Sequence, residues 1–209
     1  MHELTLRKVL KSLLSPLLAA SLLSQSALAQ TDAFPAKPIR IIASTSPGGL
    51  TDLLARNLGR QMSESLGQQV VVENRPGAGT LIGMTACARA PADGYTLLMA
   101  SPPLTISPAL YASMPYKPEQ IAPVGLVGRV PNVLLVNPKS GINSVADLIA
   151  RAKREPARMN YASNGNGTSL HLSAELLKSS TGTFITHIPY RGAAAAVTAL
   201  MAGEIDMMF

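Results

Sequence analysis

Two glycine-rich segments hold the residues best suited to chemistry, because each stands where an apolar run gives way to helical periodicity. Residues 46–52 read SPGGLTD and residues 164–172 read NGNGTSLHL. Glycine lets the backbone approach a ligand closely, and the free N–H groups at the start of a helix, with its dipole, favour an anion. Hydroxyl groups that could donate to an oxyanion accompany both segments: Ser46, Thr51, Thr168 and Ser169. Each segment therefore predicts half of a carboxylate site.

Helix capping is the alternative for either segment taken alone, since Ser, Thr, Asn and Asp begin helices in every class of protein. The same device at corresponding places in two parts of the chain favours binding. Asp52 is expected in a first helical turn, where a carboxylate suits the dipole whether or not it touches a ligand. Arg191 could pair with an anion or could be solvated.

A third glycine pattern, residues 77–79 (GAG) with Gly83, resembles a dinucleotide-binding turn. That motif requires a strand that runs directly into the turn, whereas residues 74–76 (NRP) intervene here. A structural turn is the preferred interpretation, and no cofactor is expected.

Catalytic constellations are sparse. Beyond residue 29 the histidines are His171 and His187, and no cluster of metal-ligating side chains or G-x-S-x-G nucleophile motif is present. Ser169 and His171 lie two positions apart on a predicted helix and so face different directions. For His171, packing is preferred over a place in a cleft. We therefore predict neither an enzyme nor a metal site.

Alternating strands and helices must position these turns. Strands are predicted at residues 39–43, 70–72 and 96–100, separated by helices at residues 50–66 and 78–89, with a proline-rich loop at Pro102 and Pro103. Apolar residues recur at three- and four-residue spacing through residues 50–66, and Gly67 ends that helix.

The same order repeats after a connection spaced by Pro115, Pro118 and Pro123. Further strands are predicted at residues 124–127, 133–136, 160–162, 184–188 and 204–209. Helices are predicted at residues 144–154, capped by Ser144, and at 169–179 and 193–202. The pattern indicates an α/β fold with two similar lobes, residues 30–123 and 124–209, and a cleft between them.

The first 29 residues have the layout of a secretory signal peptide. Arg7, Lys8 and Lys11 precede an apolar run that is too short and interrupted to span a bilayer, and Ala27-Leu28-Ala29 offers a peptidase site. No cysteine follows that site, so neither a lipid anchor nor a membrane anchor is expected after cleavage. The expected location is the periplasm.

Composition excludes some partners. The chain has 18 Lys and Arg against 12 Asp and Glu, with 4% aromatic residues. Nucleic-acid binders concentrate positive charge on one face and interleave aromatic rings, so no nucleic-acid partner is expected. The single cysteine, Cys87, cannot form an internal disulfide and is expected to be a small buried helix residue.

From residue 34 to the last residue, the chain resembles the extracytoplasmic solute receptors of tripartite tricarboxylate transporters, the Bug-type periplasmic binding proteins. The motifs that carry the resemblance occur in fixed order: KPIRII (37–42), PGGLTD (47–52), VVVENRPGAG (70–79), DGYTLLM (93–99), SPALY (107–111), PNVLLVNP (131–138), NGNGT (164–168), HIPYRGA (187–193) and GEIDMMF (203–209).

The resemblance implies two Rossmann-like lobes of a type II periplasmic binding protein, which close on a small organic acid delivered to membrane permease subunits. Backbone N–H groups and bridging waters would hold the carboxylate. Matched position by position, the implied substrate-binding residues are Ser46, Pro47, Gly48, Gly49, Ser101, Gly165, Asn166, Gly167 and Thr168. Relatives commonly have Phe-Pro-Pro before the first Gly-Gly. Thr45, Ser46 and Pro47 stand there in this chain, so the substrate cannot be transferred from any relative.

Family members continue well beyond the strand that reaches Phe209. The resemblance therefore implies that the second lobe and the return through the hinge are incomplete. We therefore expect a product that is marginally folded, aggregation-prone and weak or inactive in solute binding. Apolar faces of residues 50–66 or of the adjoining sheet should be exposed. Three alternatives remain open: an exported sensing partner, a non-functional truncated remnant, and an exported α/β enzyme acting on acidic substrates.

Cleavage after Ala29 is the first testable prediction, because the Ala27-Leu28-Ala29 site follows a positive and then an apolar segment. Mass spectrometry of the exported protein should find a soluble product that begins at Gln30. An uncleaved chain retained in the membrane would contradict the prediction.

Overall fold

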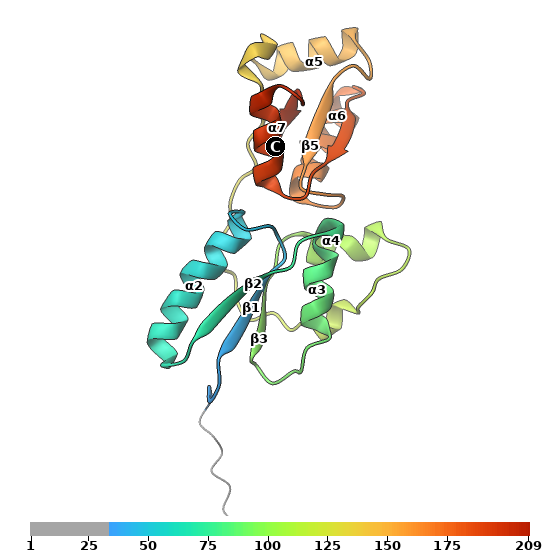
Figure 1. Ribbon diagram of the computed structural model, residues 1–209. Helices are drawn as coiled ribbons and strands as arrows, with labels where there is room; N and C mark the ends of the chain where they lie inside the picture. Colours follow the sequence, from blue (N-terminus) through green and yellow to red (C-terminus); the bar gives the residue numbers. More distant parts are fainter. Residues whose placement is uncertain (1–33) are drawn as a thin grey trace, which may run out of the picture. The chain divides into compact units, whose positions relative to one another are not determined.

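This computed structural model describes residues 34–209, which form two β-sheets with flanking helices (Figure 1). The signal-peptide prediction falls on residues 1–29, outside the described residues. Residues 37–209 form one compact unit that contains both sheets. In the described part, no helix is long and apolar enough to cross a membrane.

The first sheet has the parallel order β2-β1-β3, formed by β1 (Ile39–Ala43), β2 (Val70–Asn74) and β3 (Thr96–Met99). α2 (Leu50–Leu66) joins β1 to β2, and α3 (Leu81–Ala88) joins β2 to β3. Successive crossovers run in opposite directions along the sheet. Because such crossovers are right-handed, their helices cover opposite faces, and Figure 1 shows α2 and α3 on either side of the strands. This doubly wound arrangement agrees with the Rossmann-like lobe that the family resemblance implies.

Alternation along the strands decides which side chains meet which helix. Ile41 and Ala43 pack with Ala55 of α2, whereas Leu98 packs with Leu81 and Met84 on the α3 side. Glycine allows close approach on both faces, since a Cβ on Gly59 would lie 3.3 Å from Val70, and a Cβ on Gly83 would lie 2.9 Å from the Ser44 Cα.

The second sheet has the order β4-β7-β5-β6, formed by β4 (Leu135–Val136), β5 (Asn160–Ser163), β6 (Thr186–Pro189) and β7 (Met207–Met208). β5 is parallel to both β6 and β7, and β4 is antiparallel to β7. Its helices are α5 (Val145–Arg154), α6 (Ser169–Thr181) and α7 (Ala193–Ala202).

Two cores lie on the two faces of this sheet. Tyr161 and Met207 pack with Leu148 of α5 and Ala174 of α6, whereas Ala162 and Met208 pack with α7. The alanines of α7 let it lie close against the strands. Ser144 caps α5 as predicted, since its Oγ accepts from the Asp147 N–H at 3.1 Å.

The structure corrects several sequence predictions. The segment after Ser101 is a helix, α4 (Pro103–Leu110), and not only a proline-rich loop. Pro103 stands at the first helical position, where the missing N–H is not needed, so the prolines do not prevent a helix. Residues 124–127 do not form a strand, because no neighbouring strand pairs with them, and only Leu135–Val136 of the expected 133–136 is paired.

Short 3₁₀ helices complete the chain: η2 (Ala78–Thr80), η3 (Pro118–Gln120) and η4 (Pro138–Ser140). The predicted helix at residues 78–89 is thus divided, since Thr80 has a φ of 81° just before α3 begins.

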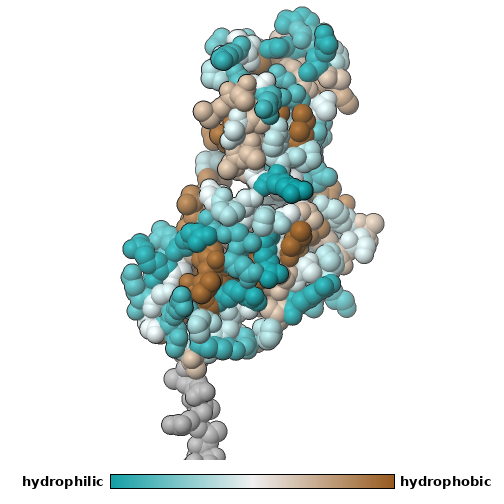
Figure 2. Space-filling model, viewed as in Figure 1, coloured by the Kyte–Doolittle hydropathy of each residue, from teal (hydrophilic) through white to brown (hydrophobic). Residues whose placement is uncertain are grey.

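Apolar side chains reach the surface in the segment without paired strands. Val124 is 91% exposed and Leu126 is 74% exposed. Leu50 and Leu53 of α2 are also exposed. Figure 2 shows apolar side chains among the polar ones on the visible face.

Gly83→Ala should lower the free energy of unfolding by about 1–3 kcal/mol, because the new Cβ would press on the Ser44 backbone between α3 and β1. Urea unfolding is the measurement. Gly125→Ala is the matched control, since nothing lies within 4 Å of its added Cβ. Equal stability of the two variants would contradict the close packing of α3.

Candidate functional site

The first glycine turn, between β1 and α2, is held by bonds within itself. Gly48 has a φ of 78°, and its N–H donates to Asp52 Oδ2 at 2.9 Å. The Gly49 N–H donates to the Ser46 carbonyl at 3.2 Å. The Thr45 and Thr51 hydroxyls also contact each other. These contacts fix the direction in which α2 begins.

Asp52 is buried, yet it has several donors. Arg56 and Asn74 both reach its Oδ1 at 2.9 Å. Burial raises the pKa of the Asp52 carboxyl, but the hydrogen bonds from Arg56, the Gly48 N–H and Asn74 outweigh burial and hold the pKa below its ordinary value. The carboxylate therefore acts as an ionised brace behind the turn.

The second glycine turn, between β5 and α6, repeats this design. Gly165 and Gly167 have φ values of 121° and 78°. The Gly165 N–H donates to Ser163 Oγ at 3.0 Å, and the Gly167 N–H donates to His171 Nδ1 at 3.3 Å. Thr168 caps the helix, accepting from the His171 N–H and donating to the Gly165 carbonyl.

A third turn lies between β6 and α7, where Gly192 has a φ of 128° just before the helix begins. The Ser46 hydroxyl donates to the Arg191 carbonyl at 2.5 Å, so the first and third turns are in contact. Our sequence analysis missed this turn as a site. Its signal was the same strand, glycine and helix order in residues 186–193.

A pocket of about 330 Å³ lies where these turns meet. Its wall includes the first residues of α2, α6 and α7, which are Leu50, Thr51, Ser169, Leu170, Ala193 and Ala194. The first intrahelical donors are Leu53, Leu172 and Ala196, each bonded to the residue before its helix. The wall residues precede those donors, so their N–H groups have no intrahelical acceptor.

Three helix N-termini at one pocket create a positive field without a cationic side chain. Each helix start carries the equivalent of roughly half a positive charge. Arg191 is exposed and is not part of the pocket wall. The arrangement suits an anion that is bound by backbone donors.

The structure brings together five of the residues predicted from sequence: Ser46, Pro47, Gly49, Ser101 and Thr168 line the pocket. Gly48, Gly165, Asn166 and Gly167 are outside the lining set. The N–H groups of Gly48, Gly49, Gly165 and Gly167 are engaged inside the turns. The glycines therefore shape the turns. The N–H groups without an intrahelical acceptor belong to the first residues of the helices that follow.

Sequence analysis missed the apolar wall, formed by Val130, Val133, Leu135, Met208 and Phe209. These residues are distant in sequence from the turns. All but Val130 lie in the motifs PNVLLVNP and GEIDMMF, which carry the family resemblance but were not assigned to the site. It also missed Asn164, whose buried Oδ1 has no hydrogen-bond partner in the described part of the chain. An acceptor here is suited to a hydroxyl group or a water molecule beside an anion.

Groups that could support catalysis have a poor geometry for it. Ser163 Oγ and His187 Nε2 are 2.7 Å apart, as in a nucleophile and base, but Ser163 is 0% exposed and cannot meet a substrate. Among residues 34–209, no group of three or more His, Cys, Asp or Glu side chains is placed to hold a metal ion.

Comparison with known proteins gives the family. The sequence profile described as "Tripartite tricarboxylate transporter family receptor" (TctC) matches residues 54–209. A UPF0065 protein of Bordetella pertussis is 41% identical over 95% of this chain and 62% of its own length. BugT of the same organism is 46% identical over 83% of this chain and 54% of its own length. The chain thus spans little more than half of these relatives.

Solved structures agree. R. palustris Rpa4515 with adipate is 36% identical, with a TM-score of 0.79, over 84% of this chain and 59% of that chain. The periplasmic binding protein BugD is 32% identical, with a TM-score of 0.76, over the same shares. The fold predicted from the sequence is therefore confirmed, and the chain belongs to the receptor family of the tripartite tricarboxylate transporters.

Proposed function

We propose that this chain captures a small organic carboxylate in the periplasm and presents it to the permease subunits of a tripartite tricarboxylate-type transporter. The observation that carries the proposal is the meeting of three helix starts at one pocket. Its wall includes Leu50, Thr51 and Ser169, whose N–H groups have no intrahelical acceptor. Backbone donors and aligned dipoles stabilise a carboxylate without a counter-charge.

The pocket's composition narrows the ligand class. The pocket wall includes hydroxyl-bearing residues and the three helix starts, whereas Val130, Val133 and Phe209 supply apolar side chains. A mono- or dicarboxylate with a short aliphatic body fits both parts, because its methylene groups lose water against the wall while the carboxylate keeps hydrogen bonds. R. palustris Rpa4515 with adipate, and MatC with bound malate at 28% identity and a TM-score of 0.74, support this class.

Two other functions from the sequence analysis are separated by experiment. A sensing partner would co-purify with a signalling receptor rather than with permease subunits. An exported enzyme would convert an acid that it binds, which NMR of the acid after incubation would detect. The buried Ser163 weighs against the enzyme.

Thermal shift of the purified chain with adipate, malate and other organic acids tests the function. We expect one class of acid to raise the unfolding temperature in proportion to the logarithm of its concentration. If every acid leaves the transition unchanged, carboxylate capture by this chain is wrong.

Gly49→Val and Gly167→Val should each weaken carboxylate binding by about tenfold or more, and Arg191→Ala should leave it nearly unchanged. A Cβ on Gly167 would lie 2.7 Å from Leu110 at a φ of 78°, and one on Gly49 would lie 3.1 Å from the Thr45 hydroxyl. Both changes displace a helix start. Calorimetry measures the affinities, and circular dichroism checks folding.

Arg191→Ala is the matched control, because it removes a positively charged side chain that lies outside the pocket wall. If that variant proves the most damaging of the three, capture depends on a side-chain charge and the backbone account is wrong.

A further inference from the structure

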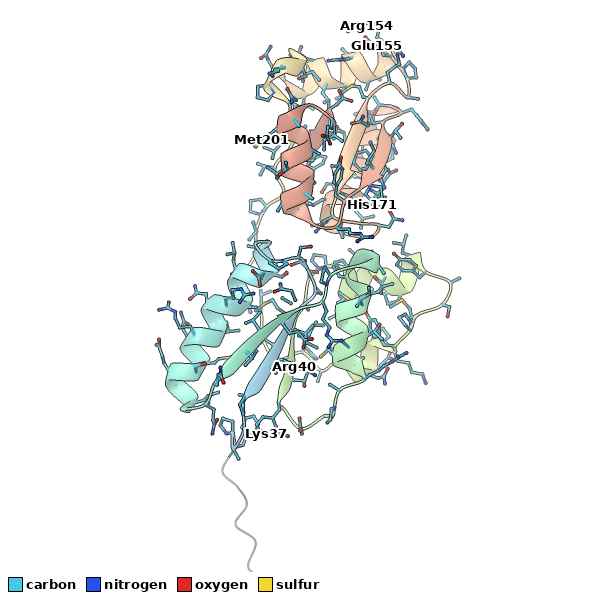
Figure 3. The ribbon with its side chains drawn as sticks, viewed as in Figure 1. Lys37, Arg40, Arg154, Glu155, His171 and Met201 are labelled. Carbon is cyan, nitrogen blue, oxygen red and sulfur yellow. The ribbon has the colours of Figure 1, made fainter. Side chains whose placement is uncertain are left out.

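A cluster of polar and aromatic side chains lies beneath the second glycine turn. Tyr161 and Ser163 come from β5 and His187 from β6, while His171, Glu175 and Lys178 follow one face of α6. The His187 ring lies 4.7 Å from the Tyr161 ring and 4.6 Å from the His171 ring. His171, labelled in Figure 3, stands at the start of α6. The site described above uses none of these rings as a ligand contact.

This cluster holds both glycines of the turn. Gly167 donates its N–H to His171 Nδ1, and Gly165 donates its N–H to Ser163 Oγ. Ser163 is in turn 2.7 Å from His187 Nε2. Gly165 and Gly167 adopt positive φ values that other residues rarely tolerate, and these bonds hold the turn in that conformation.

The bond to Gly167 also fixes the proton of His171. An N–H can donate only to an unprotonated ring nitrogen, so Nδ1 of His171 must be unprotonated. A neutral ring then carries its proton on Nε2. Protonation of Nδ1 would place its N–H opposite the Gly167 N–H, so the hydrogen bond that holds the turn would be lost.

The corresponding position in α2 shows what is unusual about His171. In three helices, a side chain in the first turn accepts from the N–H four residues before it. The pairs are Asp52 with Gly48 in α2, His171 with Gly167 in α6, and Asp147 with Asn143 in α5. Two of these helices use an ionised acceptor. α6 uses an imidazole, which braces the turn without a negative charge beside a pocket suited to an anion.

Four groups from three elements face the His171 ring. They are Tyr161 on β5, His187 on β6, and Glu175 and Lys178 on α6. Burial lowers the pKa of His171, and the Lys178 charge lowers it further, while Glu175 opposes them. Burial also lowers the pKa of His187, to about 4. The Glu175 carboxylate already accepts two hydrogen bonds, from the Tyr161 hydroxyl at 2.5 Å and from Lys178 Nζ at 2.6 Å.

We propose that His171 is a positioning residue of the carboxylate site: its bare Nδ1 fixes the Gly167 peptide and thereby aims the first N–H groups of α6 into the pocket. The residue acts through the turn and does not touch the ligand. This inference rests on the proposed function for its effect on affinity, but the bond itself exists in the unliganded chain.

The pH dependence follows from the direction of the shift. The unfolded chain protonates His171 near the ordinary pKa of 6.5, whereas the folded chain resists the proton. The stabilisation is complete above that pH and is lost as the pH falls through the lower folded pKa. The brace therefore weakens on the acidic side of neutrality.

Nitrogen-15 NMR of the unliganded chain tests the brace. At pH 7.5 we expect His171 Nδ1 to be unprotonated, and the Gly167 amide resonance to titrate together with the His171 ring. His171→Phe, which keeps a ring without an acceptor, should shift the Gly167 amide, and His171→Asn should restore much of the wild-type position. A proton on Nδ1 at pH 7.5, or a Gly167 amide indifferent to His171→Phe, would overturn the proposal.

Calorimetry with adipate and malate tests the consequence for binding. We expect His171→Phe to weaken affinity about tenfold at pH 7.5 and His171→Asn to stay within about threefold of wild type. As the pH is lowered to 5, the ratio of wild-type affinity to His171→Asn affinity should fall, because only the imidazole titrates. Comparing proteins at one pH cancels protonation of the acid itself.

Asp147→Ala is the matched control, since it removes the equivalent brace of α5, away from the pocket. It should lower stability and leave affinity unchanged. Equal affinity losses in folded His171→Phe and Asp147→Ala would reduce His171 to a stabilising cap and overturn the positioning role. If the wild type binds neither acid while Gly167 still titrates with His171, the proposed function fails and the brace stands.

Discussion

The structure depends on the N–H groups that every helix leaves without an acceptor in its first turn. In this chain, the starts of α2, α6 and α7 contribute such groups to one pocket. A peptide N–H in an apolar surrounding costs several kcal/mol if it finds no partner, on the order of 2–7 kcal/mol by transfer measurements. A bound carboxylate would satisfy several of these donors together, which is how we propose that unpaired backbone N–H groups produce affinity for the ligand.

Fixed turns make this use of the backbone possible. Each of the first two helix starts is braced by a side chain in its own first turn, Asp52 for α2 and His171 for α6, and each brace engages the glycine N–H that precedes the capping residue. The glycines supply the positive φ, while the donors for a ligand come from later residues. The apolar wall at Val130, Val133 and Phe209 then limits water around the donors, which strengthens electrostatic attraction.

Much of this could be read from the sequence. Apolar periodicity predicted α2 with its observed bounds, and an alanine-rich segment predicted α7 with its observed bounds. Gly67 and Ser144 marked helix ends through local chemistry that does not depend on the rest of the fold. Residues 124–127 failed as a strand, since a strand needs a partner that no local pattern reveals. The pocket wall and the His171 brace were also missed. The wall depends on residues brought together from distant segments. The brace joins residues only four positions apart, but a histidine in a first helical turn looks the same in sequence whether it caps, packs or binds.

An amide NMR titration of the folded chain with adipate would show whether the N–H groups at the three helix starts bind the carboxylate. The account predicts saturable shifts of the Leu50, Thr51, Ser169, Leu170, Ala193 and Ala194 amides, with one common dissociation constant, since these N–H groups precede the first intrahelical bonds of three helices. Saturable binding that leaves those six amides unmoved, and instead shifts lysine or arginine side-chain resonances, would contradict it.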